Sequence, residues 1–262
     1  MMSEDTAAAP SRPRGRGRRI AAWTAAVVLL AAIAVVVWAA VPRAPDEDRF
    51  SAVIEDEAVV VDEGEGYLRL TPAGAEPERG VVFYPGARVA PAAYAATWAP
   101  IVEETGTAVF IPAMPLNFAF FAIDRAEEVI AAEDGIDTWV VGGHSLGGAM
   151  ATSHLGRGGA GADVDGLLLW ASYPTEGAGL DARDDLAALS VVGDRDGRTT
   201  LDEVEQRRDL LPPAAEVVVI EGMNHAQFGA YGEQARDGEP AISDREAAAA
   251  LGEATATWLL ER

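Results

Sequence analysis

Two kinds of hydrophobic pattern divide the chain. Residues 20–41 form an apolar run of 22 residues without a charged side chain. At about 1.5 Å per residue, a helix of that length spans roughly 33 Å, enough to cross a hydrocarbon core of about 30 Å. From about residue 50 onward, apolar runs of strand length alternate with amphipathic stretches. The pattern therefore predicts one transmembrane helix followed by an alternating α/β domain.

Eight short segments of the domain have the composition of strands, and the first two frame a Gly-rich turn at residues 64–66. Strands are expected at 58–61, 67–70, 81–84, 107–111, 138–141, 167–170, 189–192 and 216–220, and helices at 92–104, 124–133, 146–155, 201–211 and 244–260. Continuous apolar strands alternating with helices predict a mainly parallel sheet covered on both faces.

Charges on either side of the apolar run predict its orientation. Five arginines precede it, namely Arg12, Arg14, Arg16, Arg18 and Arg19, whereas acidic residues 46–48 follow it. This asymmetry predicts a single-pass protein of the cell membrane with its N-terminus in the cytoplasm and its domain outside. We expect a cytoplasmic tail at 1–19, a signal-anchor helix at 20–41, a tether at 42–49 and the domain at 50–262. The alternative is a cleaved signal peptide, although such peptides have a shorter apolar region and no clean cleavage site precedes Pro42.

Composition excludes several classes of function. The formal net charge is −22, so a nucleic-acid-binding surface is not expected. The chain has no cysteine, which excludes disulfides, thiolate catalysis and cysteine-bound zinc.

The most informative motif lies between the strand expected at 138–141 and the helix at 146–155. It reads Gly143-His-Ser-Leu-Gly147, a Gly-x-Ser-x-Gly sequence. In a strand–turn–helix context this sequence places a serine on a sharp turn, with its hydroxyl above the sheet. The amides at the helix N-terminus also point at this position and can stabilise an anion. The motif therefore indicates Ser145 as a nucleophile.

A serine nucleophile needs a base, and the chain has three histidines. His144 is expected to face away from the chemistry of Ser145, and His154 to have a partly exposed structural role. His225 follows the last expected strand, at the sheet edge where α/β folds assemble their sites, and it is therefore the predicted base. The orienting acid should lie between Ser145 and His225, where both Asp194 and Asp196 follow a strand.

The chain resembles the α/β-hydrolase superfamily, most closely its small, lid-poor family 5 branch. The motifs that carry the resemblance are Phe83-Tyr-Pro-Gly86, the Gly-His-Ser-Leu-Gly-Gly turn, the Gly-x-x-Asp-Gly turn at 193–197 and the Asn-His-Ala-Gln-Phe-Gly-x-Tyr-Gly run at 224–232. The resemblance implies that Ser145 is the nucleophile, His225 the base and Asp196 the acid.

The same resemblance implies an oxyanion hole and an open site. The donors would be the backbone N–H of Leu146 and that of Ala87 or Arg88. Only 18 residues separate Trp170 from Leu189, which leaves no room for a cap domain. Dienelactone hydrolases are less similar because they use a cysteine nucleophile.

These features predict a membrane-anchored, extracytoplasmic serine hydrolase of the carboxylesterase or thioesterase type, acting through an acyl-enzyme on a small-molecule acyl substrate. No metal or organic cofactor is implied, and the oligomeric state is left open. An acyltransferase or lyase on the same scaffold is an alternative, as is a non-catalytic envelope-binding protein. The aromatic run at 114–121 fits an acyl-chain wall and ordinary core packing equally well.

Overall fold

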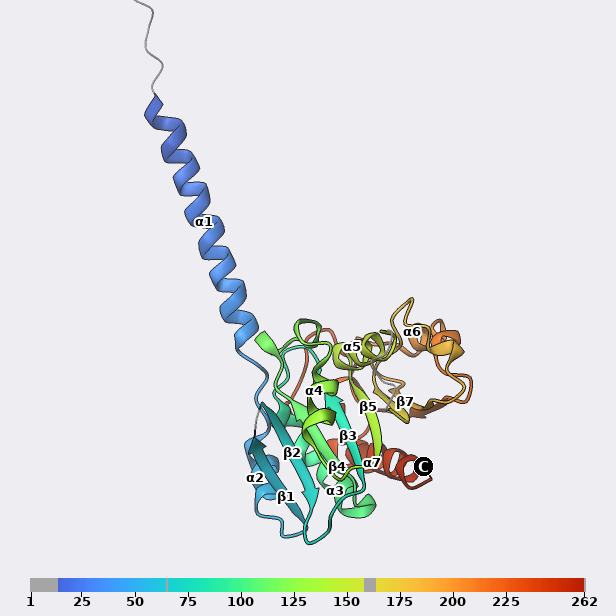
Figure 1. Ribbon diagram of the computed structural model, residues 1–262. Coiled ribbons are helices and arrows are strands. Elements are labelled where there is room, and N and C mark those ends of the chain that lie inside the picture. Colours follow the sequence, from blue (N-terminus) through green and yellow to red (C-terminus); the bar gives the residue numbers. More distant parts are fainter. Residues whose placement is uncertain (1–13, 65, 158–163, 262) are drawn as a thin grey trace, which may run out of the picture. The chain divides into compact units, whose positions relative to one another are not determined.

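The computed structural model describes residues 14–64, 66–157 and 164–261 (Figure 1). It divides the chain into two compact units, Met1–Ala39 and Ala40–Arg262. We refer to the second unit as the domain.

Helix α1 (Arg14–Ala40) lies in the first unit except for its last residue. Its segment Arg19–Ala40 has a mean hydropathy of 2.7 and is long and apolar enough to cross a membrane. This agrees with the apolar run seen in the sequence. The same length and composition fit either a membrane anchor or a signal sequence.

The domain is built on one eight-stranded sheet with the order β1-β2-β4-β3-β5-β6-β7-β8. The strands are β1 (Val59–Gly64), β2 (Tyr67–Pro72), β3 (Arg79–Tyr84), β4 (Ala108–Pro112), β5 (Thr138–His144), β6 (Gly166–Trp170), β7 (Ala187–Gly193) and β8 (Glu216–Ile220). Strands β1 and β2 form the expected antiparallel hairpin, β2 pairs antiparallel with β4, and the pairs from β4 through β8 are parallel. The prediction of a mainly parallel sheet is confirmed.

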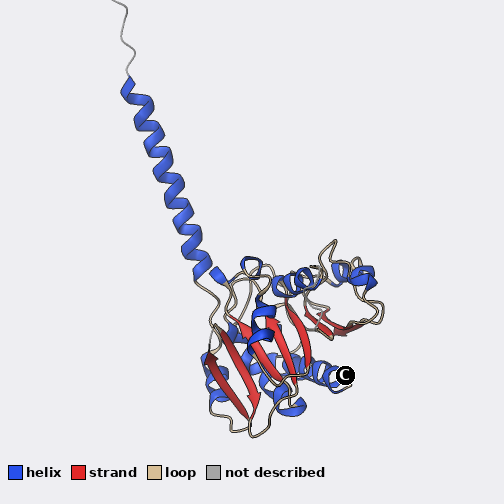
Figure 2. Ribbon diagram, viewed as in Figure 1, coloured by secondary structure: helices blue, strands red, loops and turns tan. Residues whose placement is uncertain are grey.

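Helices cover both faces of this sheet, as Figure 2 shows in blue against the red strands. Successive residues of β3 point to opposite faces, so Phe83 belongs to one core cluster and Tyr84 to the other. Helices α3 (Ala95–Thr105) and α7 (Asp244–Leu260) pack on the Phe83 face. Helices α4 (Arg125–Ala132) and α5 (Leu146–Leu155) pack on the Tyr84 face.

Aromatic rings fill the first of these cores. The Phe83 ring lies 4.6 Å from that of Trp170 and 5.2 Å from that of Trp98, between ring centroids. The two indoles stack at 4.8 Å. Such contacts bury large apolar areas at the carboxyl ends of β3 and β6.

Two segments differ from the sequence-based expectation. The helix expected at 201–211 is instead α6 (Leu201–Glu205) followed by the short 3-10 helix η5 (Arg208–Leu210). Within the expected tether, helix α2 (Glu47–Ile54) begins after Asp46, whose side chain accepts a hydrogen bond from the Arg49 N–H. Acidic residues in a first turn favour a helix, which explains why the tether ends so early.

Candidate active site

Ser145 occupies a strained turn between β5 and α5. Its φ of 53° and ψ of −124° are unusual for a residue with a side chain. A Cβ on Gly147 would lie 2.1 Å from the Tyr84 carbonyl oxygen, and one on Gly143 would lie 2.5 Å from the same atom. The two glycines are therefore required because the turn presses against the end of β3.

Hydrogen bonds on both sides hold Ser145 in this conformation. The Ser145 N–H donates to the Trp170 carbonyl over 3.0 Å, and the Ser145 carbonyl accepts the Ser172 hydroxyl over 2.8 Å. Strained backbone persists only where the surrounding structure fixes it in this way. The structure thus has the strand–turn–helix arrangement that the motif predicted, with the Ser145 side chain partly exposed.

His225 and Asp196 form a buried pair. His225 lies beyond the end of β8, Asp196 lies beyond the end of β7, and the distance from Nδ1 to Oδ2 is 2.7 Å. The exposed fraction of the side chain is 1% for His225 and 0% for Asp196. The second carboxylate oxygen accepts N–H groups from Arg198 and Thr199 at 2.8 and 2.7 Å. A carboxylate bonded at both oxygens is well placed to orient an imidazole.

Asp194 has a different partner. Its Oδ1 accepts the Gly222 N–H over 2.6 Å, and its nearest basic atom is the Arg195 Nε at 3.9 Å. Of the two acids that the sequence left open, Asp196 is therefore the one in contact with His225.

The structure narrows the set of candidate oxyanion donors. Of the two alternatives expected after β3, the Arg88 N–H donates to the Asn117 carbonyl over 2.8 Å, which leaves Ala87 as the candidate donor. Within the described part of the chain, the N–H groups of Leu146 and Ala87 have no acceptor. The same holds for the Ser145 Oγ and the His225 Nε2, and catalytic hydrogen bonds often tighten only when a substrate binds.

His144 corrects an expectation, because it does not face away from the site. It is 1% exposed, and its ring centroid lies 4.5 Å from that of His225. The Tyr94 hydroxyl lies 2.9 Å from His144 Nδ1 and accepts the Gly86 N–H over 2.8 Å. His144 thus connects the loop after β3 to the predicted base.

Aromatic rings from the 224–232 run complete the surroundings of His144. Its ring stacks on that of Phe228, with 5.6 Å between centroids and 15° between planes, and lies 6.4 Å from that of Tyr231. Burial lowers the pKa of His144 well below its usual value, and the charge of His225 acts in the same direction. His144 is therefore a neutral, buried group.

Asp237 is a further residue that the sequence did not reveal. Its Oδ1 accepts N–H groups from Gly197 at 3.1 Å and His225 at 3.2 Å, and its Oδ2 accepts that of Ala226 at 2.8 Å. It therefore joins the turn that carries Asp196 to the loop that carries His225. Asp237 lies in a polar turn without a motif, so no sequence signal distinguishes it from the many other acidic residues.

His154 is also more buried than expected, at 1% exposure. Its Nδ1 lies 3.3 Å from the Asp124 Oδ1, and Arg157 contacts the other oxygen of that carboxylate at 2.6 Å. This cluster joins the end of α5 to the start of α4, which is the structural role expected of His154.

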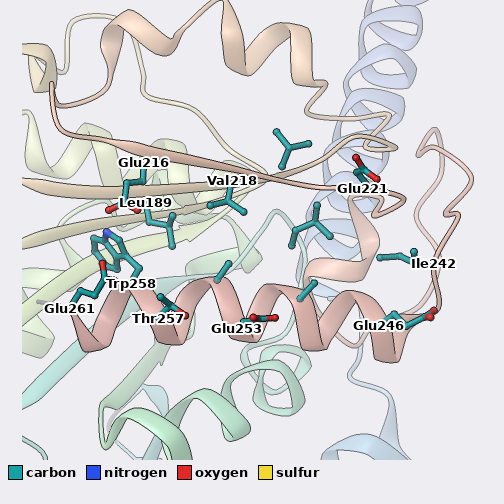
Figure 3. A pocket seen from close by; sticks show the side chains of 14 residues that line it. Leu189, Glu216, Val218, Glu221, Ile242, Glu246, Glu253, Thr257, Trp258 and Glu261 are labelled. Carbon is teal, nitrogen blue, oxygen red and sulfur yellow. The ribbon is translucent and has the colours of Figure 1, made fainter.

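A groove of about 650 Å³ lies elsewhere, between β8 and α7 (Figure 3). Leu189, Val218 and Trp258 contribute to its apolar lining, and glutamates such as Glu216 and Glu253 stand at its rim. It shares no lining residue with the Ser145 and His225 region. In the described ranges, no three His, Asp or Glu side chains are grouped so that they could hold a metal ion.

The low pKa of His144 predicts a pH dependence of stability. Below about pH 6.5 the unfolded chain protonates this imidazole while the folded chain does not, so stability present above that pH is lost as the pH falls. We expect the free energy of unfolding of the wild type to fall relative to that of His144→Gln by up to about 1.4 kcal/mol per pH unit as the pH falls below about 6.5. Denaturant unfolding of the full chain in detergent measures this difference.

Tyr94→Phe is the matched control for that experiment. It removes the hydroxyl but keeps the buried imidazole, so its pH dependence should follow the wild type, because burial is the main cause of the shift. Parallel curves for the wild type and His144→Gln would contradict a neutral His144.

Comparisons with known proteins agree with this fold. The model of the alpha/beta hydrolase family matches residues 80–249. The structure is similar to that of a hyperthermophilic esterase from the archaeon Pyrobaculum calidifontis, with a TM-score of 0.56 and 16% identity over 82% of this chain and 92% of that one. It is also similar to the esterase domain of a Rhodothermus marinus protein, with a TM-score of 0.55 and 14% identity over 78% and 97% of the two chains.

A hormone-sensitive lipase from a metagenome library gives a TM-score of 0.56 at 14% identity, over 82% of this chain and 91% of that one. No curated protein matches the chain. At these identities the solved structures bear on the fold alone, whereas the family model covers well over half of the sequence. The resemblance inferred from the motifs is thereby confirmed, and the chain belongs to the alpha/beta hydrolase family.

Proposed function

We propose that this protein is a membrane-anchored serine hydrolase that cleaves ester-type acyl bonds outside the cytoplasm. The observation that carries the proposal is that Ser145, on its strained turn, directly follows His144, whose ring lies 4.5 Å from that of His225 in the buried His225–Asp196 pair. Ser145, Asp196 and His225 lie beyond the carboxyl ends of parallel strands β5, β7 and β8. This is the edge at which α/β folds bind their ligands.

The chemistry of these groups is acyl transfer in two steps. The Ser145 oxygen attacks the substrate carbonyl while the His225 Nε2 takes the hydroxyl proton. Asp196 holds the imidazole by its Nδ1–H and stabilises the positive charge that forms. His225 then gives the proton to the leaving alcohol or thiol, which leaves an acyl-enzyme. Water activated by the same imidazole releases the acid and restores the serine.

The negative charge that develops on the substrate carbonyl oxygen needs hydrogen-bond donors. The N–H groups of Leu146 and Ala87 are proposed for this role, because both are unpaired in the described structure and flank Ser145 and the end of β3. Removing one such donor typically costs about 10²–10³ in turnover.

The anchor and its orientation belong to the same proposal. Within helix α1 the apolar run has the length and hydropathy for a span, and the five arginines that precede residue 20 favour a cytoplasmic N-terminus. The domain would then work on the outer side of the membrane.

Ser145→Ala should leave the fold intact and reduce ester hydrolysis by about 10⁴-fold or more, because no other group replaces the nucleophile. The assay is hydrolysis of short acyl esters by the full chain in detergent, with labelling by a fluorophosphonate as a direct readout of Ser145. A wild-type protein that neither hydrolyses esters nor takes the label would instead favour a binding protein. Transfer of the acyl group to an added alcohol rather than to water would favour an acyltransferase.

The two neighbouring acids offer a matched pair of variants. Asp196→Asn should reduce kcat by at least about 10²-fold, because an amide presents the wrong group to the His225 Nδ1. Asp194→Asn should stay within about tenfold of the wild type, because its carboxylate contacts the Gly222 N–H instead. Steady-state kinetics on one ester, with unfolding curves as a check on stability, compares them. The opposite order of effects would transfer the role to Asp194.

A fusion test addresses the topology. A reporter enzyme that works only outside the cytoplasm, fused after Arg262, should be active, because the arginines before the span retain the N-terminus inside. A reporter that works only in the cytoplasm, fused at the same position, is the control and should be silent. The reverse result would reject the proposed orientation.

A further inference from the structure

We propose that residues 114–121, called the aromatic loop below, contact the surface of a lipid bilayer, and that the substrates of this site are acyl esters held in that bilayer. The inference rests on the proposed hydrolase activity and anchor. It adds the class of substrate and the surface that reaches it.

The aromatic loop exposes rings that the domain otherwise buries. Phe120 is 46% exposed and Phe121 54% exposed, with their ring centroids 4.3 Å apart, and the Phe118 ring lies 5.3 Å from that of Phe120. Among the described residues of the domain, the other strongly exposed bulky apolar side chains are the aliphatic Val41, Ile54, Val60, Val219 and Leu260. Adjacent exposed aromatic rings are typical of surfaces that meet a membrane or a partner.

The loop backbone holds these rings outward. Met114 and Ala119 are buried in the core beside α4 and α5, which anchors the loop at two positions. Between them Leu116 and Asn117 have φ values of 52° and 59°, and the Asn117 N–H donates to the Met114 carbonyl over 2.9 Å. Leu116 and Asn117 both have left-handed backbone conformations, which residues with side chains rarely adopt. The surrounding structure must therefore fix this turn, and the turn holds the rings in their exposed positions.

Arg88 connects the aromatic loop to the candidate site. Its N–H donates to the Asn117 carbonyl over 2.8 Å, and it directly follows Ala87, the proposed oxyanion donor. The aromatic loop also packs on α5, whose first residue follows Ser145. The aromatic loop is therefore joined to the residue after the proposed oxyanion donor and to the helix that follows Ser145.

Arg88 also binds the segment that follows the apolar helix. Its guanidinium donates to the Val41 carbonyl over 2.7 Å, and its own carbonyl accepts the Arg43 N–H over 2.5 Å. The Ala90 N–H completes this short parallel bridge by donating to the Arg43 carbonyl over 3.0 Å. Within the domain, then, the first residues after Ala40 are fixed to the same loop that holds the aromatic turn.

This arrangement indicates which partner the aromatic loop contacts. If Arg19–Ala40 spans the membrane, the covalent chain must emerge from the bilayer at the residues bound to Arg88, and the aromatic loop is bound to that same arginine. Aromatic side chains favour the interface between headgroups and acyl chains. A bilayer is therefore the partner that the chain itself brings to this surface, and its acyl esters are the substrates nearest to Ser145.

The first test does not depend on activity. Because the chain has no cysteine, Phe120→Cys provides a single site for an environment-sensitive nitrobenzoxadiazole label. In the full chain reconstituted into phosphatidylcholine vesicles, this label should shift to shorter emission wavelength and be quenched by nitroxide-bearing lipids. Val219→Cys, on the edge strand β8, is the control and should show neither effect. Equal responses at both positions, or none at position 120, would overturn the proposal.

The second test separates the surface from the chemistry. The double variant Phe120→Ser with Phe121→Ser should lose about tenfold or more in the hydrolysis of a long-chain ester embedded in vesicles. It should keep its rate on a soluble short-chain ester within about twofold. Val219→Ser should change neither rate. Equal losses on both substrates, or no loss on the embedded one, would overturn the inference.

The proposed function fails separately from this inference. Retained ester hydrolysis by Ser145→Ala would reject the serine mechanism. The fluorescence of the label at position 120 in vesicles does not depend on Ser145, so it would still test the membrane contact.

Discussion

The arrangement of this site depends on the burial of an imidazole beside a carboxylate. A buried carboxylate is costly unless its oxygens are hydrogen-bonded, and Asp196 meets that cost with the His225 Nδ1 and two backbone N–H groups. Those donors exist only if the turn after β7 curls toward the loop after β8. Asp237 enforces this by binding amides from both segments. The backbone around His225 is thus determined largely by the hydrogen bonds that the carboxylates of Asp196 and Asp237 accept.

The nucleophile turn obeys a different constraint, which is steric. Gly143 and Gly147 both lie against the Tyr84 carbonyl, so the turn after β5 approaches the end of β3 more closely than residues with side chains would allow. The loop after β3 carries Ala87, so this contact fixes the distance between the predicted nucleophile and a proposed oxyanion donor. The position of Ser145 is therefore set by the packing of neighbouring strands, and its strain is retained because that packing does not relax.

Most of the fold could be predicted because its strands are continuous apolar runs and its turns carry glycines. Ser145, His225 and Asp196 could be singled out as candidates because each lies in a motif just beyond a strand. Tyr94 and Asp237 lie in segments without any motif. Their contacts depend on the order of the strands in the sheet, which could not be predicted from the sequence. Helix α2 was missed because its eight residues look like a charged linker when the contact of Asp46 with the domain is unknown. The occupied amide of Arg88 likewise depends on a loop some 30 residues away.

The 224–232 run packs around His144, which lies in the nucleophile motif. The rings of Phe228, Tyr231 and His225 all lie near the His144 ring, with centroids 5.6, 6.4 and 4.5 Å away. A histidine at the middle of the nucleophile motif and the aromatic residues after the base are therefore one packed unit. Tyr94 joins that unit to Gly86, where a Cβ would lie 2.7 Å from the His144 Nδ1. Three motifs that are distant in the sequence are thus coupled through a single neutral imidazole, and a change in any one of them alters the space available to the other two.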